Sequence, residues 1–250
     1  MTTDQPPLLT DAAPRVSRFL ARESAGRVGI ARVDITPPVG VRAHNWGASR
    51  IGVATGIHRP LTATALAIAD GDGVGLLVTA DLGWWGSTTS FLEVFEPLVE
   101  AVGLARDDVL LHLIHTHAGP SLAESDGDLP GADLLRAYRE RLVAALATVA
   151  TAAIDNLAPA VMTWGVGRCG LAVNRDLPCG VRDVVGFNPD VPADDTVLIG
   201  RLTGADGAIR GTVVNYACHP TTLAFHNSEI SPDYIGAARE VVEHVTGAPM

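Results

Sequence analysis

The sequence lacks the features that mark several protein classes. Its three cysteines, Cys169, Cys179 and Cys218, are an odd number without the spacing of a metal site, which suits a reducing compartment. Acidic residues outnumber Lys and Arg, and the formal net charge is -10. A nucleic-acid surface needs clustered positive charge, so the composition argues against nucleic acid as a partner.

Long apolar runs and an export signal are also missing. No run approaches the roughly 18 to 20 residues that are needed to span a bilayer. Residues 1–25 carry Asp4 and three prolines, without the basic start and apolar stretch of a signal peptide. We therefore expect a cytoplasmic protein without a transmembrane segment, in which residues 1–26 form a loose leader.

What is present indicates a globular α/β protein. The chain has 47% hydrophobic and 18% charged residues, and its 250 residues suffice for one large domain or two small ones. Apolar periodicity and turn residues predict strands over 28–35, 61–68, 74–80, 109–114, 160–166, 196–202 and 208–217. The same criteria predict helices over 87–102, 132–157 and 234–245, and a mostly irregular segment over 168–192. Strand pairs joined by short turns, with helices interspersed, favour packed mixed or antiparallel β-sheets flanked by helices.

Two of the predicted strands end in histidine. The apolar run VLLHLI leads into His115 and His117, and Gly-Pro then stops the strand. The run VVNYAC leads likewise into His219. Strand residues alternate faces, so we expect His115 and His117 to point the same way. Because neutral imidazole is a common zinc ligand, the two strand ends together indicate a metal site.

A structural role for these histidines is the competing interpretation. A lone histidine at a strand end is more often a cap or a core residue than a ligand. The HxH motif is weak by itself, and its pairing with a second strand-end histidine is what favours metal binding.

Other residues near these strand ends allow two interpretations each. Asp81, at the end of a predicted strand, could orient a ligand imidazole or could be an ordinary turn residue. Arg175, in the long irregular segment, could donate to a substrate or could pair at the surface with Asp176 or Asp183. Residues 41–56, with Trp46, form a predicted loop that could line a pocket.

Five segments, in order along the chain, resemble the neutral, non-lysosomal ceramidase family. The segment HTHAGP at 115–120 is similar to the family's THTHSGP, and NYACHPT at 215–221 is similar to its later His-Pro-Thr segment. The other three are GIARVDITPP at 29–38, GIHRPL at 56–61 and the Asn-Arg-Asp that begins at Asn174. The resemblance covers nearly the whole chain, from about Gly29 to Pro249.

The resemblance implies a fold, a reaction and a set of site residues. It implies face-to-face sheets with helices outside, and zinc-dependent hydrolysis of a lipid-like linear amide, as in sphingolipid metabolism. By resemblance, His115 and His219 are ligands of one zinc ion, and His117 and Arg175 act in catalysis. Asn174 and His58 take substrate-binding positions.

The remaining zinc ligands of the family, a Glu and a Tyr, lie well downstream of the His-Pro-Thr segment. The resemblance thus implies that residues 27–250 form a catalytic region that is incomplete at its C-terminus, unless Asp81, Glu229 or Asp233 completes the coordination. Two other functions stay open. One is an esterase or lactonase on the same metal site, and the other is a non-catalytic binding protein or inactive fragment that keeps the fold.

Overall fold

The computed structural model describes residues 23–71, 73–122 and 128–250. A seven-stranded sheet, in the order β10-β9-β6-β1-β3-β4-β5, dominates the described chain. Neighbouring strands are antiparallel except for the parallel pair β4–β5. The strands of this sheet are β1 (Glu23–Asp34), β3 (Thr62–Asp70), β4 (Gly73–Ala80), β5 (Val109–Leu113), β6 (Ala158–Arg168), β9 (Thr196–Gly204) and β10 (Ile209–Tyr216). The predicted mixed α/β architecture is therefore confirmed.

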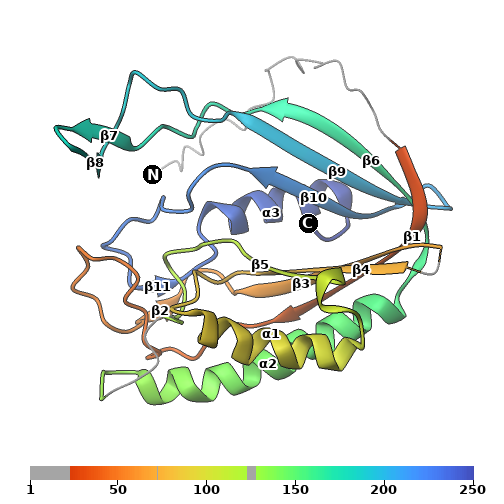
Figure 1. Ribbon diagram of the computed structural model, residues 1–250, viewed down its shortest axis with the longest axis horizontal. Coiled ribbons are helices and arrows are strands. Elements are labelled where there is room, and N and C mark those ends of the chain that lie inside the picture. Colours follow the sequence, from red (N-terminus) through yellow and green to blue (C-terminus); the bar gives the residue numbers. More distant parts are fainter. Residues whose placement is uncertain (1–22, 72, 123–127) are drawn as a thin grey trace, which may run out of the picture.

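Strand β1 joins the two halves of this sheet. Its first residues, from Glu23 to Val28, pair with β6, and its residues from Arg27 to Asp34 pair with β3. In Figure 1 the sheet bends at β1, so that β6, β9 and β10 lie above β3, β4 and β5. The face-to-face sheets implied by the resemblance are thus two halves of one continuous sheet.

Helices α1 (Thr88–Val102) and α2 (Ala132–Asp155) cover the outer face of the half formed by β1, β3, β4 and β5 (Figure 1). Alanines at alternate positions of β3, including the fully buried Ala63 and Ala65, leave room for α2 to pack closely. The predicted apolar stripe of α2 faces this core, and Tyr138 donates a hydrogen bond of 2.7 Å to the Ile35 carbonyl. Helix α1 has its N-cap at Ser87, which forms a capping box with Ser90 in the first turn.

Helix α3 (Tyr234–Thr246) departs from the expectation that helices lie outside. Figure 1 shows it between the two halves of the sheet. Charged pairs hold it there: Glu243 contacts Arg32 of β1 at 2.7 Å, and Arg239 contacts Asp81 at 2.6 Å. The helix is capped by Asp233 and begins at Tyr234, as predicted, so Pro232 lies before the helix.

Several short strands were not expected. Strands β7 (Asp176–Cys179) and β8 (Arg182–Val185) form a hairpin inside the segment expected to be irregular. Strands β2 (Gly56–Ile57) and β11 (Glu229–Ile230) form a parallel pair. Strand β1 begins within the expected leader, and residues 1–22 of that leader lie outside the described residues. In the described parts of the chain, no helix combines the length and apolarity required to cross a membrane.

Gly29 marks the closest approach between β1 and α2. A Cβ atom at this position would overlap the Ala153 carbonyl and the backbone at Asn156. We expect Gly29→Ala to lower the free energy of unfolding by about 1–3 kcal/mol, the usual cost of overpacking, as measured by urea denaturation. Gly75→Ala in β4 is the matched control, because its Cβ would meet no atom within 4 Å. Equal stability of the two variants would contradict this account of the packing.

Candidate metal centre

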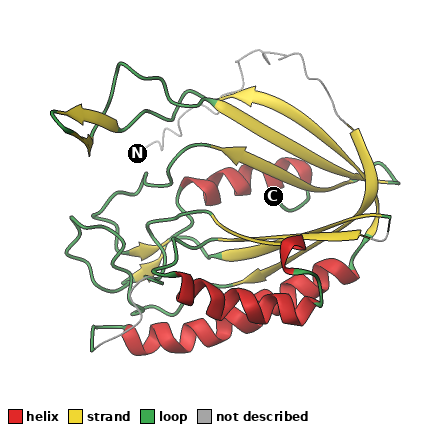
Figure 2. Cartoon of the chain, viewed as in Figure 1, coloured by secondary structure: helices red, strands yellow, loops and turns green. Residues whose placement is uncertain are grey.

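The candidate site lies on loops at one end of the sheet. These loops, green in Figure 2, gather at the end where β2 and β11 also lie. Strand β5 ends at Leu113, two residues before His115, and β10 ends at Tyr216, three residues before His219. His115 has a φ of 65°, which is uncommon for a residue other than glycine. The left-handed backbone conformation of His115, and not strand alternation, therefore sets the direction of its side chain.

His115, His117 and His219 converge. One nitrogen from each ring lies within 4.8 Å of the others. The ring centroid of His219 lies 4.8 Å from that of His115 and 4.8 Å from that of His117. The Nε2 atoms of His117 and His219 are 2.8 Å apart. Two segments about a hundred residues apart in the chain thus deliver three imidazoles to one point.

Hydrogen bonding fixes the tautomer of His117. Its Nδ1 lies 2.9 Å from the Asn45 carbonyl oxygen, which only accepts, so Nδ1 carries the proton. Nε2 therefore presents a lone pair toward His219. Asn45 is buried and is itself held by a 2.6 Å hydrogen bond from its side-chain nitrogen to the Gly119 carbonyl.

The electrostatic environment keeps the three imidazoles neutral. Burial lowers the pKa of His115 and His117, and the positive charge of Arg175 lowers both further. Hydrogen bonds to backbone groups raise both pKa values, but the net shift is downward. The pKa of His219 is lowered to about 4, first by burial and then by Arg175 and the other two histidines. Neutral imidazole is the form that binds metal, so these lowered pKa values favour metal binding at pH 7.

Two tryptophans wall the site. The ring centroid of Trp46 lies 4.5 Å from that of His117, and Trp84 lies 5.3 Å from His115 and 5.0 Å from His117. The predicted loop over 41–56 thus lines the site through Trp46. Trp85 packs instead against Phe91 of α1, with 6.1 Å between the ring centroids.

Arg175 and Asn174 lie on the segment between β6 and β7. Arg175 is exposed, and its charge acts on all three histidines, so its guanidinium is near the site. Among the described residues it has no ion pair with Asp176 or Asp183, the surface alternative considered above. The side-chain oxygen of Asn174 accepts from the Asp176 backbone at 3.0 Å, a local turn contact.

His58 lies outside the histidine group. Its Nδ1 is 3.2 Å from the Ser231 hydroxyl, and its Nε2 is 3.0 Å from the Arg59 guanidinium. The expected substrate-binding position of His58 is therefore adjacent to the segment that precedes α3.

Asp81, Glu229 and Asp233 were the carboxylates considered as additional ligands. Among the described residues, the group that could hold a metal ion consists of the three histidines and includes none of these carboxylates. Asp81 forms a two-pronged ion pair with Arg239, which favours the structural interpretation over the orientation of an imidazole. Asp233 accepts from backbone and hydroxyl groups, and Glu229 is exposed beside Gly56.

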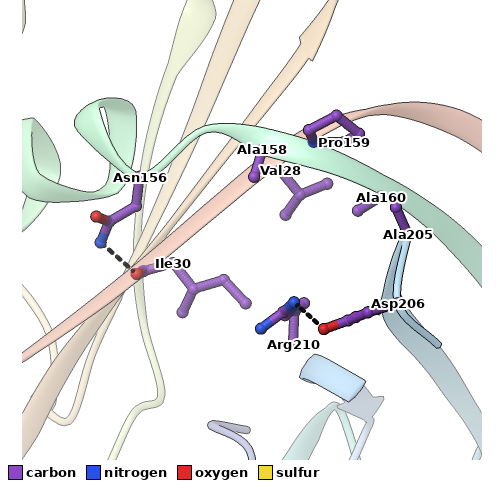
Figure 3. A pocket seen from close by; sticks show the side chains of 9 residues that line it. All are labelled: Val28, Ile30, Asn156, Ala158, Pro159, Ala160, Ala205, Asp206 and Arg210. Atoms are coloured by element: carbon purple, nitrogen blue, oxygen red, sulfur yellow. Dashed lines mark hydrogen bonds and ion pairs between the residues drawn. The ribbon is translucent and has the colours of Figure 1, made fainter. Parts of the chain in front are cut away.

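A separate cavity of about 560 Å³ lies near the bend in the sheet (Figure 3). It is lined by Val28, Ile30, Asn156, Ala158, Pro159, Ala160, Ala205, Asp206 and Arg210. Its polar groups have partners: Asn156 donates to the Ile30 carbonyl, and Arg210 pairs with Asp206 at 2.7 Å. No candidate site residue lines this cavity, so it is distinct from the histidine group.

The histidine group suits a transition metal such as zinc. Catalytic zinc sites commonly use three protein ligands and keep one position open, and imidazole nitrogen is a preferred donor. The Nε2 atoms of His117 and His219 face each other at 2.8 Å. A shared proton or a nearby cation would satisfy this arrangement. The donor chemistry of this group therefore fits a metal ion.

Comparisons with known proteins agree on one family. A family model described as neutral/alkaline non-lysosomal ceramidase, N-terminal, matches residues 27–249. The crystal structure of neutral ceramidase from Pseudomonas aeruginosa superposes with a TM-score of 0.69 at 23% identity, covering 89% of this chain and 37% of that chain. A structure described as ceramidase complexed with C2 gives a TM-score of 0.66 at 22% identity, covering 89% of this chain and 36% of that chain. The chain thus spans little more than a third of these structures, and at these identities the likeness concerns the fold.

Proposed function

The chain belongs to the neutral/alkaline non-lysosomal ceramidase family, and from this membership we infer that it forms the histidine-bearing part of a zinc-dependent hydrolase of linear amides. The proposed substrate class is an N-acyl amide such as ceramide, cleaved to a fatty acid and an amine. The observation that carries the proposal is the convergence of three neutral imidazoles on one point.

Each residue of the site has a proposed role. His115 and His219 are assigned as zinc ligands, following the family resemblance. A zinc ion bound there would supply Lewis acidity, which polarises a carbonyl and eases the deprotonation of water. His117 has an unprotonated Nε2 beside His219, and its proposed role is to accept a proton from the attacking water and return it to the leaving amine.

Arg175 is assigned to the substrate carbonyl. Its guanidinium presents several N–H donors, so it is proposed to stabilise the negative charge that develops on the carbonyl oxygen. Trp46 and Trp84 lie against the rings of the site, and they are proposed to contact the acyl chain of the substrate.

The test is a comparison of amide and ester substrates. Protein that has been reconstituted with zinc is assayed on an N-acyl amide of ceramide type and on an ester with the same acyl chain. We expect hydrolysis of the amide, and loss of that activity when zinc is removed by a chelator and recovery when it is returned. Arg175→Ala is expected to lower kcat by about 100- to 1000-fold, the usual cost of losing an oxyanion donor.

Two outcomes would contradict the proposal in different ways. Cleavage of the ester alone would favour an esterase or lactonase on the same site. A protein that binds zinc and cleaves neither substrate would favour the non-catalytic alternative.

A further inference from the structure

The three histidines sit on loops, so something other than the sheet must set their relative positions. Both loops contact the same short segment, Ser231 to Asp233, which joins β11 to α3. This segment is buried, with Ser231 at 0% and Asp233 at 4% exposure. We call it the α3 entry segment.

The α3 entry segment is bonded to the loop that carries His115 and His117. Thr116, which lies between these histidines and is fully buried, donates from its hydroxyl to the Ser231 carbonyl at 2.7 Å. The Ser231 N–H donates in turn to the Ala118 carbonyl at 2.8 Å. The pair of bonds spans His117 and holds this loop against the segment.

The carboxylate of Asp233 is bonded to the loop that follows His219. Its Oδ1 accepts from the Thr222 hydroxyl at 2.6 Å and from the Thr222 N–H at 3.1 Å, and its Oδ2 accepts from the Leu223 N–H at 3.1 Å. Oδ1 also accepts from the Tyr234 N–H at 2.7 Å, at the start of α3. Backbone donors and the positive end of the helix therefore stabilise this buried charge.

The backbone of Asp233 is held in an unfavourable conformation. Its φ of 57° and ψ of -147° lie close to a region that is almost restricted to glycine. Such a conformation persists where the surrounding contacts over-determine it, and it is enriched at functional sites.

We propose that Asp233 is a positioning residue: it fixes the loop of His219 against the loop of His115 and His117, so that the two proposed ligands, His115 and His219, meet beside His117. An ionised carboxylate has acceptors on both oxygens, whereas an asparagine has only one oxygen for the same four donors. The inference rests on the proposed metal site and concerns a residue that does not touch the reacting atoms.

The test measures metal binding directly. Cobalt(II) and zinc affinities are determined by chelator competition, and the visible absorption bands of the cobalt(II) protein report the coordination geometry. We expect Asp233→Asn to weaken both affinities by about 10- to 100-fold, as for other residues that orient ligands, and to change the cobalt bands. Thr222→Ala removes the shortest of the donors without a change of charge, and we expect a smaller loss in the same direction with the same spectral change.

A matched control variant shows whether a change in metal affinity comes from lost positioning of the loops or only from the loss of a negative charge. Asp194→Asn removes a carboxylate that also accepts from a threonine N–H, at 2.9 Å, but it lies in an exposed turn outside the site. It is expected to leave the affinities and the spectrum unchanged. If Asp233→Asn does not fold, the test uses Thr222→Ala, because Thr222 is exposed and its replacement leaves the charge of Asp233 in place.

The outcomes distinguish this inference from the proposed function. Wild-type affinities and an unchanged spectrum in both Asp233→Asn and Thr222→Ala would overturn the positioning role and leave the proposed function standing. Metal binding that is weakened as expected, in a protein without amidase activity, would support the positioning role and overturn the proposed reaction. An absence of metal binding in the wild type would overturn both.

Discussion

His115→Ala and His219→Ala are each expected to weaken zinc binding by on the order of 100-fold or more. Structural zinc sites bind with about 10–16 kcal/mol from four ligands, so one ligand accounts for roughly 3 kcal/mol, or a factor of about 100. Chelator competition with purified protein measures the affinity. The matched control is His112→Ala, since His112 is an exposed histidine on β5 that lies outside the histidine group.

His117→Ala is expected to separate binding from catalysis. The proposed role of His117 is to move a proton, so this variant should retain most of its zinc and lose about 100- to 10,000-fold in kcat. A loss of zinc equal to that of His115→Ala would show that His117 is a ligand and contradict the assignment of its role. Retention of zinc by His115→Ala and His219→Ala would contradict the site itself.

Arg239→Ala is expected to have the largest effect on stability, a loss of about 3–5 kcal/mol in the free energy of unfolding. Asp81 has 1% and Arg239 11% side-chain exposure, and the guanidinium bonds both carboxylate oxygens at 2.6 and 2.7 Å. Removal of the arginine leaves a buried carboxylate, and within the described parts of the chain this carboxylate then keeps its bonds from the backbone and hydroxyl of Thr62. It also releases α3 from the end of β4.

The control for this variant is an exposed ion pair. Arg210 and Asp206 are 55% and 57% exposed, and such pairs contribute about 0–1 kcal/mol, so Arg210→Ala should be nearly neutral. Urea denaturation of the two variants gives the comparison. Similar losses in both would mean that the pair of Asp81 and Arg239 does not anchor α3.

The local signals in the sequence were sufficient for most of the regular structure. Helix α1 was predicted from its Ser caps and apolar spacing, and the structure places its N-cap at Ser87 and its left-handed C-cap at Gly103. The long apolar stripe of α2 packs on β1 and β3 as its periodicity indicated. These elements were predictable because burial of one face is encoded within a single window of sequence.

Elements that depend on distant partners were not predictable in the same way. Helix α3 carries charged residues that are typical of a solvated helix, but Arg239 and Glu243 are paired with Asp81 and Arg32 inside the fold. The hairpin of β7 and β8 is mostly exposed, so its sequence lacks the apolar alternation by which a strand is recognised. It also contains Pro178, a residue that is uncommon within strands. Strands of two residues, such as β2 and β11, carry no periodicity at all.

The sequence indicated that the histidines would meet, but it did not indicate the geometry of their meeting. The apolar runs before His115 and His219 indicated that the two segments would meet, and the three imidazoles do converge. The left-handed conformation of His115 is a backbone property that the apolar pattern does not encode. The hydrogen bonds of Asp233 to the loop that follows His219 join two separate segments of the chain. Asp233 was considered as a metal ligand, but its oxygens are occupied by the loop that follows His219.

The most direct test of the proposed metal site is the metal content of the wild-type protein. Elemental analysis of folded protein, purified without chelator and then dialysed against zinc-containing buffer, gives the number of bound ions per chain. We expect about one zinc per chain, bound to His115 and His219 and lost in both alanine variants. A well-folded protein that retains no zinc, or as much zinc as its His115→Ala variant, would contradict it.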